Sequence, residues 1–214
     1  MARPPYNTLD HPGEAEHVVD RSRFLAYALP VETVEEAEAF VAALRKTHHD
    51  ARHVVYGFRI GHGAALVDRS NDDGEPSRTG GFPVWQLLEG GEVTDALVAV
   101  VRYFGGVKLG MGGLARAYRE AGRQAIDAAG VVTRYPELAF DLTVPYSTVD
   151  TLQHVLQKEL PDVRVLDTAY AADVTFTLSV RFIDLEDVRA RLGALLQRAP
   201  DTIAPLIDPG RAPG

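Results

Sequence analysis

Five glycines and two basic residues lie close together between Arg102 and Gly113, in the stretch RYFGGVKLGMGG. Glycine adopts positive φ angles and lets a ligand or another backbone approach closely. Backbone N–H groups at the start of a following helix, with Lys108 beside them, favour an anion. The stretch therefore predicts an anion-binding loop or a tight, crowded turn, and residue types leave both open. Its candidate ligand-binding residues are Arg102, Gly105, Gly106, Lys108, Gly110, Gly112 and Gly113.

Two common nucleotide-binding loops do not explain this stretch. A P-loop needs Gly-Lys followed by Ser or Thr, and that triplet does not occur in the sequence. Gly110–Ala115 matches G-x-G-x-x-A, but it lacks the close strand before it and the acid-ended strand after it. We therefore predict no dinucleotide site and no cofactor.

The helix expected from about Gly113 to Ala129 carries arginines opposite its apolar side. Five basic residues and one acid, Glu120, lie between positions 102 and 123, a local charge of +4 in a chain of net charge −8. Such a surface binds phosphates or an acidic protein, or is an ordinary solvated helix face. The candidate residues on this helix are Arg116, Arg119 and Arg123.

The segment from Asn71 to Gly81, NDDGEPSRTGG, is too rich in turn-forming residues for regular structure. Its three carboxylates in four positions suit Mg²⁺ or Ca²⁺, but the EF-hand spacing is missing. We predict a solvated acidic loop, or one that pairs with Arg78, and no metal. No G-x-S-x-G elbow surrounds its serine, so no catalytic residue is predicted. The candidate residues of this loop are Asp72, Asp73, Glu75 and Ser77.

The composition limits the class of protein. The chain has 214 residues, 46% of them hydrophobic, and no cysteine, which excludes disulfides and cysteine-ligated metals. The net charge of −8 argues against a globally basic nucleic-acid binder, although a local patch can still bind. No apolar run is long enough to span a bilayer, and the N-terminus does not resemble a signal peptide. We expect a cytoplasmic protein without a membrane partner. Of its seven histidines, His48, His49 and His53 are expected to be structural or exposed.

Hydrophobic periodicity divides the first part of the chain into alternating elements. Residues 1–14 are rich in proline and polar residues and predict a loose arm. Thr33 and Glu36 form a capping box before a helix. The nearly continuous apolar run at residues 95–103 predicts a central strand covered on both faces. The other expected elements are strands at 16–30, 53–60 and 64–69 and helices at 34–46 and 82–89.

The second part has its own rhythm of strands at 138–144, 163–170, 174–183 and 202–207 and helices at 147–160 and 185–197. This β-α-β-β-α-β order is the ferredoxin-like pattern. We place the boundary between residues 133 and 137. The sequence thus predicts an α+β protein with domains at residues 1–134 and 135–214.

Three motifs together resemble the signature of the YigZ/IMPACT family. They are DDGEPS at residues 72–77, RYFGGVKLG at 102–110 and GGLARAY at 112–118, and the resemblance covers about residues 15–130. It implies an N-terminal domain of the ribosomal protein S5 domain 2-like type and a ferredoxin-like C-terminal domain. Ser77-Arg78-Thr79-Gly80 departs from the commoner Ser-Gly-Thr-Ala. The bulky Arg78 either changes what enters the acidic-loop side of the site or points into solvent.

The resemblance also implies a role in translation. Eukaryotic IMPACT proteins are linked to control of translation initiation through a protein partner, and nucleic-acid or ribosome binding is usually suggested for bacterial members. The resemblance assigns no catalytic role to any residue. We predict a non-enzymatic, translation-associated regulator that binds RNA, the ribosome or a regulatory protein through the basic glycine-loop and helix region. The alternatives are a protein–protein module without nucleic-acid contact and an uncharacterised enzyme acting on a phosphorylated ligand.

Spatial arrangement decides among these hypotheses. One concave surface shared by the acidic loop, the glycine loop and the arginines of the following helix favours a binding site, and their dispersal favours structural roles. The residues from 135 onward carry 7 basic and 12 acidic side chains, a net charge of −5, which weakens the RNA hypothesis. The sequence makes no prediction of oligomeric state.

Overall fold

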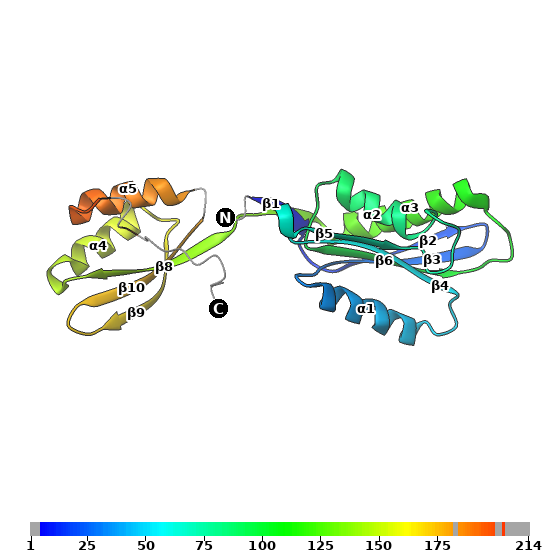
Figure 1. Cartoon of the computed structure of the whole chain (residues 1–214), viewed down its shortest axis with the longest axis horizontal. Helices are drawn as coiled ribbons and strands as arrows, with labels where there is room; N and C mark the ends of the chain where they lie inside the picture. Colours follow the sequence, from blue (N-terminus) through cyan, green and yellow to red (C-terminus); the bar gives the residue numbers. More distant parts are fainter. Residues whose placement is uncertain (1–4, 182–183, 200–202, 204–214) are drawn as a thin grey trace. The chain divides into compact units, whose positions relative to one another are not determined.

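The structure is a computed structural model that describes residues 5–181, 184–199 and 203. The chain divides into two compact α+β units, one formed by Tyr6–Arg134 and the other by the chain from Tyr135 onward (Figure 1). In the described part of the chain, no helix is long and apolar enough to cross a lipid bilayer.

The first unit is built on an antiparallel five-stranded sheet of order β2-β3-β6-β4-β5. Its central strand, β6, is buried at every position from Ala96 to Arg102, which confirms the prediction of a strand covered on both faces. The strands are β2 (Gly13–Val19), β3 (Ser22–Pro30), β4 (His53–Ile60), β5 (Val67–Asn71) and β6 (Ala96–Tyr103).

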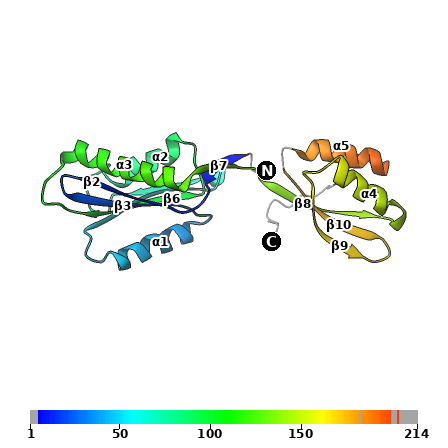
Figure 2. The same ribbon diagram turned by 180° about the vertical axis from the view of Figure 1, so that it is seen from behind.

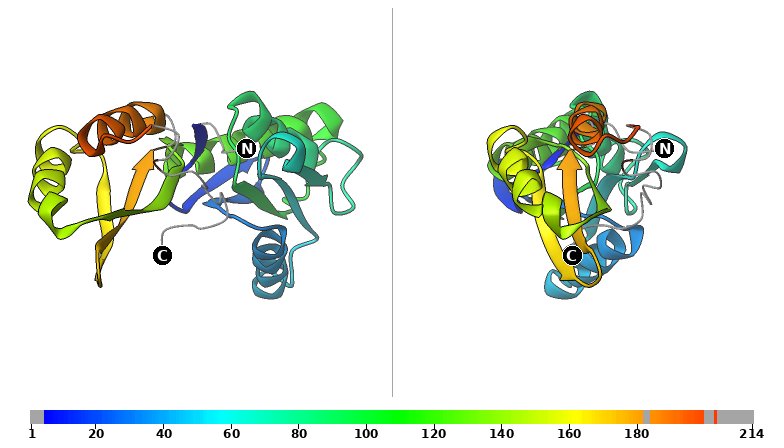
Figure 3. Two further views of the ribbon diagram at one scale, coloured as in Figure 1. Left: turned by 60° about the vertical axis from the view of Figure 1, so that its left-hand side comes forward. Right: turned by 90° about the vertical axis from the view of Figure 1, so that its left-hand side faces the viewer.

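Helices cover both faces of this sheet. α2 (Gly81–Gly90) and α3 (Gly110–Ala129) lie on one face and α1 (Val34–Thr47) on the other (Figures 1 and 2), and Figure 3 shows α1 across the sheet from them. The two faces accordingly have separate apolar clusters. The predicted capping box is confirmed, because the Glu36 N–H donates to the Thr33 hydroxyl over 3.2 Å.

The structure corrects the expected N-terminus. The loose arm predicted at residues 1–14 contains strand β1 (Tyr6–Leu9), paired with β7 (Val131–Arg134), and the start of β2. The single strand expected at 16–30 is a hairpin that turns at Asp20 and Arg21, with φ of 46° and 64°. The sequence signal was weak because hairpin turns of this kind usually carry glycine or asparagine. The strand expected at 64–69 is a short 3₁₀ turn, η1 (Gly63–Ala65), followed by β5.

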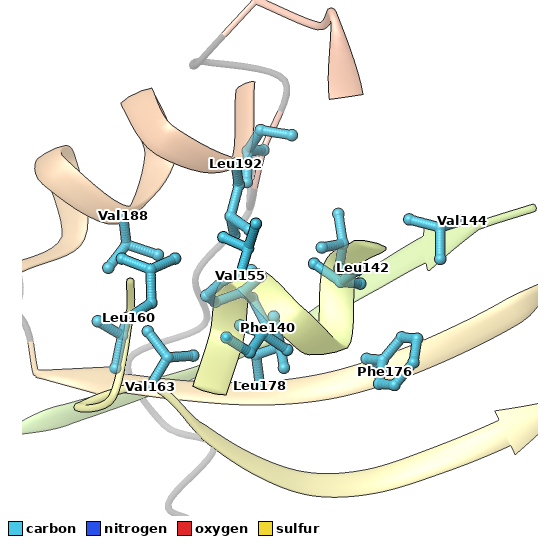
Figure 4. Packing of buried hydrophobic residues seen from close by; sticks show 14 of the residues in the cluster. Phe140, Leu142, Val144, Val155, Leu160, Val163, Phe176, Leu178, Val188 and Leu192 are labelled. Carbon is cyan, nitrogen blue, oxygen red and sulfur yellow. The ribbon is translucent and has the colours of Figure 1, made fainter. Parts of the chain in front are cut away.

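The second unit packs two helices on a three-stranded antiparallel sheet of order β8-β10-β9. Aromatic, leucine and valine side chains from the sheet and both helices fill its core (Figure 4). The strand expected at 202–207 lies outside the described residues, except for the buried Ile203. The elements are β8 (Glu137–Val144), α4 (Tyr146–Lys158), β9 (Arg164–Tyr170), β10 (Val174–Arg181) and α5 (Leu185–Leu196).

Candidate functional site

Two of the three acids of the acidic loop hold the fold together. Asp72 accepts backbone N–H groups from Arg78, Gly80 and Gly81 at 2.7, 2.9 and 2.8 Å, and so fixes the start of α2. Asp73 accepts the Val54 N–H over 2.7 Å and pairs with an α1 arginine. Their oxygens are thus already used. Among the described residues, no group of three or more His, Asp or Glu side chains is placed to hold a metal ion.

The third acid, Glu75, is buried in the first unit, with 4% of its side chain exposed. Its Oε1 accepts hydrogen bonds from Arg102 Nη1 and from the Tyr118 hydroxyl, each over 2.7 Å. Burial, followed by the charge of Glu75, raises the pKa of Tyr118 well above its ordinary value. The phenol therefore stays protonated and donates to the carboxylate. This triad connects the acidic loop to β6 and α3.

Arg102 lies at the centre of the site, between two phenyl rings. Its guanidinium carbon is 5.6 Å from the centre of the Phe24 ring and 5.5 Å from that of Phe104. Its Nε is buried and has no hydrogen-bond partner in the described part of the chain. A buried polar atom of this kind is costly, which is typical of residues kept for a function as well as for the fold.

A cavity of about 400 Å³ opens above this triad, and we call it the loop hollow. Its lining includes Glu75 from the acidic loop, Arg102 from β6 and Lys108 from the glycine loop. The two loops therefore share one concave surface, which is two of the three parts of the arrangement predicted for a binding site; the arginines of α3, the third part, are not in its lining. The lining residues are Arg52, His53, Glu75, Pro76, Arg102, Phe104, Lys108, Leu109, Gly110, Met111 and Leu114.

The loop hollow combines unpaired positive charge with exposed apolar surface. Arg52 and Lys108 are exposed, and neither forms an ion pair within the residues that the structure describes. Phe104 is 49% exposed and Met111 62% exposed, although both are large apolar side chains. An exposed apolar group of this kind beside cations is typical of a surface that binds an anionic ligand with a flat apolar part.

His53 contributes a ring nitrogen to the loop hollow. Its Nδ1 lies 2.7 Å from the Asp73 carbonyl oxygen, which accepts only, so Nδ1 carries the proton. Nε2 lies 4.0 Å from Glu75 Oε2. The expectation of a structural histidine thus holds for Nδ1, while the other nitrogen remains available to a ligand.

The glycines of the glycine loop have different roles. A Cβ at Gly105 would lie 2.1 Å from the Arg21 carbonyl carbon, so a close approach between chain segments requires glycine there. Gly106 and Gly110 have φ of 89° and 67°, in the region that glycine favours. Gly112 and Gly113 lie in the first turn of α3, which begins three residues earlier than predicted. Of the five, only Gly110 lines the loop hollow.

The predicted arginines of α3 do not form one site with the loops. Arg123 pairs with Glu120 and Asp127 at 2.7 and 2.5 Å, and Arg119 donates to Gln86 over 2.7 Å. Arg116 lines a separate hollow with His17 and Glu120. Among the described residues, Arg123 is thus the only one of these three arginines that pairs with acidic side chains.

Some residues of the loop hollow were missed by the sequence analysis, and some predicted ones lie elsewhere. The sequence did not identify Arg52 as a cavity residue, because it belongs to none of the motifs. Met111 was not identified because it lies in the first turn of α3, where an apolar residue is ordinary. Ser77 is exposed and does not line the loop hollow. Arg78, the departure from the family motif, stacks on Phe82 with its guanidinium carbon 3.5 Å from the ring centre.

Comparison with known proteins supplies the family. Residues 20–126 match the Impact N-terminal domain, and residues 142–197 match a domain of unknown function (DUF1949). IMPACT family member YvyE of Bacillus subtilis is 35% identical over 72% of this chain and 70% of its own. IMPACT family member YigZ of Escherichia coli is 30% identical over 81% of this chain and 85% of its own.

Solved structures also resemble the chain. A crystal structure of a hypothetical protein is 27% identical, with a TM-score of 0.62 over 91% of this chain and 94% of that one. The two-domain translational regulator Yih1 is 29% identical over 56% of this chain and 48% of that one, with a TM-score of 0.36. The first similarity extends over most of both chains and agrees with the two-part match to family domains.

Proposed function

Since this chain belongs to the IMPACT family, we propose that it is a non-enzymatic, translation-associated regulator that binds single-stranded RNA in the loop hollow. The carrying observation is that Arg52 and Lys108, both without an ion pair in the described residues, line one cavity together with the exposed Phe104 ring. Proteins bind single strands by stacking bases on aromatic rings and placing cations on phosphates. The proposed RNA surface is therefore the loop hollow, and the arginines of α3 are excluded from it.

Salt dependence tests this proposal. A fluorescein-labelled single-stranded RNA is titrated with the full chain at several salt concentrations, using fluorescence polarisation. For the Arg52→Ala/Lys108→Ala variant we expect at least about tenfold weaker binding, and a salt slope smaller by about 1.4, because each single-strand phosphate contact contributes about 0.7.

The matched control is Arg119→Ala/Arg123→Ala, which removes the same number of positive charges from the α3 surface. We expect this variant to keep the affinity and salt slope of the wild type, because neither arginine lines the loop hollow. Equal losses in the two variants, or binding that does not weaken with salt, would contradict an RNA site in the loop hollow.

A protein partner is the second candidate function, and one observation favours it. Phe104, Val107 and Met111 are all exposed large apolar residues in or beside the loop hollow. Aromatic side chains and methionine are enriched in protein–protein interfaces. A partner that binds the wild type after nuclease treatment and is lost with Met111→Glu supports this candidate. Loss of every partner on nuclease treatment contradicts it.

An enzyme acting on a phosphorylated ligand receives less support from the geometry. That hypothesis needs Asp72, Asp73 or Glu75 to hold a metal beside Lys108. Asp72 and Asp73 instead bond to backbone N–H groups and do not line the loop hollow. Glu75 does line it, but its Oε1 accepts from Arg102 and Tyr118. We therefore do not extend the proposal to catalysis.

We propose finer fold assignments for both units. The family resemblance supports a ribosomal protein S5 domain 2-like fold for residues 1–134. The element order β8-α4-β9-β10-α5 and the sheet order β8-β10-β9 support a ferredoxin-like fold for residues 135–214. A crystal structure of the full chain tests both assignments. We also propose a cytoplasmic location, which fractionation of cells expressing the chain tests.

A further inference from the structure

We propose that the loop hollow recognises the 3′-terminal ribonucleotide of single-stranded RNA, and that His53 and Glu75 accept hydrogen bonds from its free cis-diol. This inference rests on the proposed function and names the part of the RNA that is read. It arises from two hydrogen-bond acceptors, on two residues that line the cavity, for which the fold supplies no donor in the described residues.

The two acceptors are His53 Nε2 and Glu75 Oε2. The Nδ1 proton of His53 is committed to the Asp73 carbonyl, and in this tautomer the lone pair is on Nε2. Both hydrogen bonds to Glu75 end on Oε1, and within the described residues none reaches Oε2. Nε2 and Oε2 are 4.0 Å apart, too far for a hydrogen bond between them. Both atoms can therefore accept hydrogen bonds from a ligand.

The surrounding charge restricts the kind of donor. Arg52, Arg102 and Lys108 line the cavity with one carboxylate, that of Glu75, so positive charge exceeds negative. An ammonium group or a metal ion would meet this excess at close range and be repelled. Neutral hydroxyl donors avoid the repulsion, and a phosphate on the same ligand gains from Arg52 and Lys108. The ligand is thus a polyol that carries an anion.

The exposed apolar side chains of the cavity lining indicate that the ligand also has a flat apolar group. Phe104, 49% exposed, offers a ring face for stacking, with Met111 beside it in the lining. Base–aromatic stacking of this kind tolerates any base. A volume of about 400 Å³ lies in the range of small-molecule sites and accommodates one nucleotide. Hydroxyls, phosphate and base together describe a ribonucleotide.

The diol indicates which nucleotide of an RNA is bound. Inside a strand, the 3′ oxygen is esterified and only the 2′ hydroxyl can donate. Only the 3′ end presents both hydroxyls, which match two separate acceptors. DNA lacks the 2′ hydroxyl at every position, so the same pair of acceptors distinguishes RNA from DNA.

Labelled RNA 12-mers of one sequence test the inference on the full chain, using fluorescence polarisation. The 3′ ends compared are a free diol, a 3′-phosphate and a 2′-deoxynucleotide. We expect the free diol to bind at least about tenfold more tightly than either alternative, since each of these leaves one of the two acceptors without its donor. Adenosine 5′-monophosphate is expected to compete with the RNA, and ribose 5-phosphate and adenosine to compete less well.

Variants keep the test decisive. His53→Ala removes one acceptor from a partly exposed side chain and leaves the Glu75–Arg102 pair in place. We expect it to abolish the preference for the free diol while salt-dependent RNA binding persists. Arg123→Ala, distant from the cavity lining, is the control and keeps the preference.

The outcomes separate this inference from the proposed function. Equal affinity for all three 3′ ends, with RNA binding still lost in Arg52→Ala/Lys108→Ala, overturns the end recognition and leaves the RNA site intact. Binding of adenosine 5′-monophosphate without any RNA binding overturns both and identifies a free nucleotide as the source of the ligand chemistry. A preference for the diol that survives His53→Ala overturns the assigned acceptor pair.

Discussion

The loop hollow and the outer face of α3 both contain arginines from the same basic stretch, but their charges are balanced differently. On α3, Arg123 lies between Glu120 and Asp127, so its charge is compensated on the surface. In the loop hollow, Arg102 is compensated by Glu75, while Arg52 and Lys108 have no ion partner among the described residues. The difference between the two regions is therefore clearest at Arg123, whose charge is balanced by two acids, and at Arg52 and Lys108, whose charges are not.

The ion pairs of the two regions also differ in burial. Glu75 and Arg102 have side-chain exposures of 4% and 10%, so water screens their interaction poorly. The α3 pairs are about one third to two thirds exposed, where an ion pair contributes little. The comparison predicts that substitutions around Glu75 affect stability strongly and substitutions on α3 hardly at all.

The largest effect is expected from Arg102→Met. The substitution leaves Glu75 buried without its charge partner, which costs about 3–5 kcal/mol of unfolding free energy. Urea unfolding followed by circular dichroism measures the loss. The double variant Glu75→Gln/Arg102→Met is expected to recover part of it, because the uncompensated charge is gone. A double variant less stable than Arg102→Met would contradict the assignment.

Tyr118→Phe tests the second bond to Glu75. It removes a hydroxyl that donates to a buried carboxylate over 2.7 Å and keeps the ring that packs edge-on against Phe24. We expect a loss of about 1.5–3 kcal/mol, the usual contribution of a hydrogen bond to a charged group. The control is Tyr135→Phe, an exposed tyrosine of the second unit, for which the unfolding midpoint stays within error of the wild type.

Gly105→Ala tests whether the glycine loop is required for packing as well as for binding. Its Cβ would lie 2.1–2.4 Å from backbone atoms of Arg21 and Ser22, which cannot move aside easily. We expect a loss of about 1–3 kcal/mol from overpacking, measured by urea unfolding. At Gly112 a Cβ meets only the Arg116 guanidinium, at 3.4 Å, so Gly112→Ala is the matched control. Equal losses at both positions would show that the close approach at Gly105 is unimportant.

Much of the fold was predictable because its signals are local. The buried strand β6 and the Thr33 cap follow from apolar runs and residue types alone. The β1–β7 pairing was missed, because its partners are more than a hundred residues apart and short strands carry little pattern. The turn at Asp20 and Arg21 was missed because neither residue is the usual choice for positive φ.

The candidate site was predictable only in part. The motifs identified Glu75, Arg102 and Lys108, which the fold brings to one cavity. Sequence did not reveal which charges are compensated, because Glu75 and Arg102 are 27 residues apart and meet only in three dimensions. The sequence also did not identify Arg52, which lines the cavity from the position just before β4. Charge counted along the chain therefore does not separate the acid-paired Arg123 of α3 from the cations of the loop hollow that have no ion pair in the described residues.

The smallest effect concerns the compensated charges of α3 themselves. Hydrogen bonds from Arg123, then Gln124, lower the pKa of Glu120 to about 2 from the ordinary value of 4.5. A lowered pKa means that the pair stabilises the fold above pH 4.5 and that this contribution is lost as the pH falls toward 2. In Arg123→Ala we expect the pKa of Glu120 to rise toward 4.5, followed by NMR titration of its side-chain carboxyl carbon. The stability at pH 7 should barely change, since the pair is exposed and screened by water. An unchanged Glu120 pKa would mean that Arg123 is free in solution, and the arginine surface of α3 would then regain its candidacy as a phosphate-binding face.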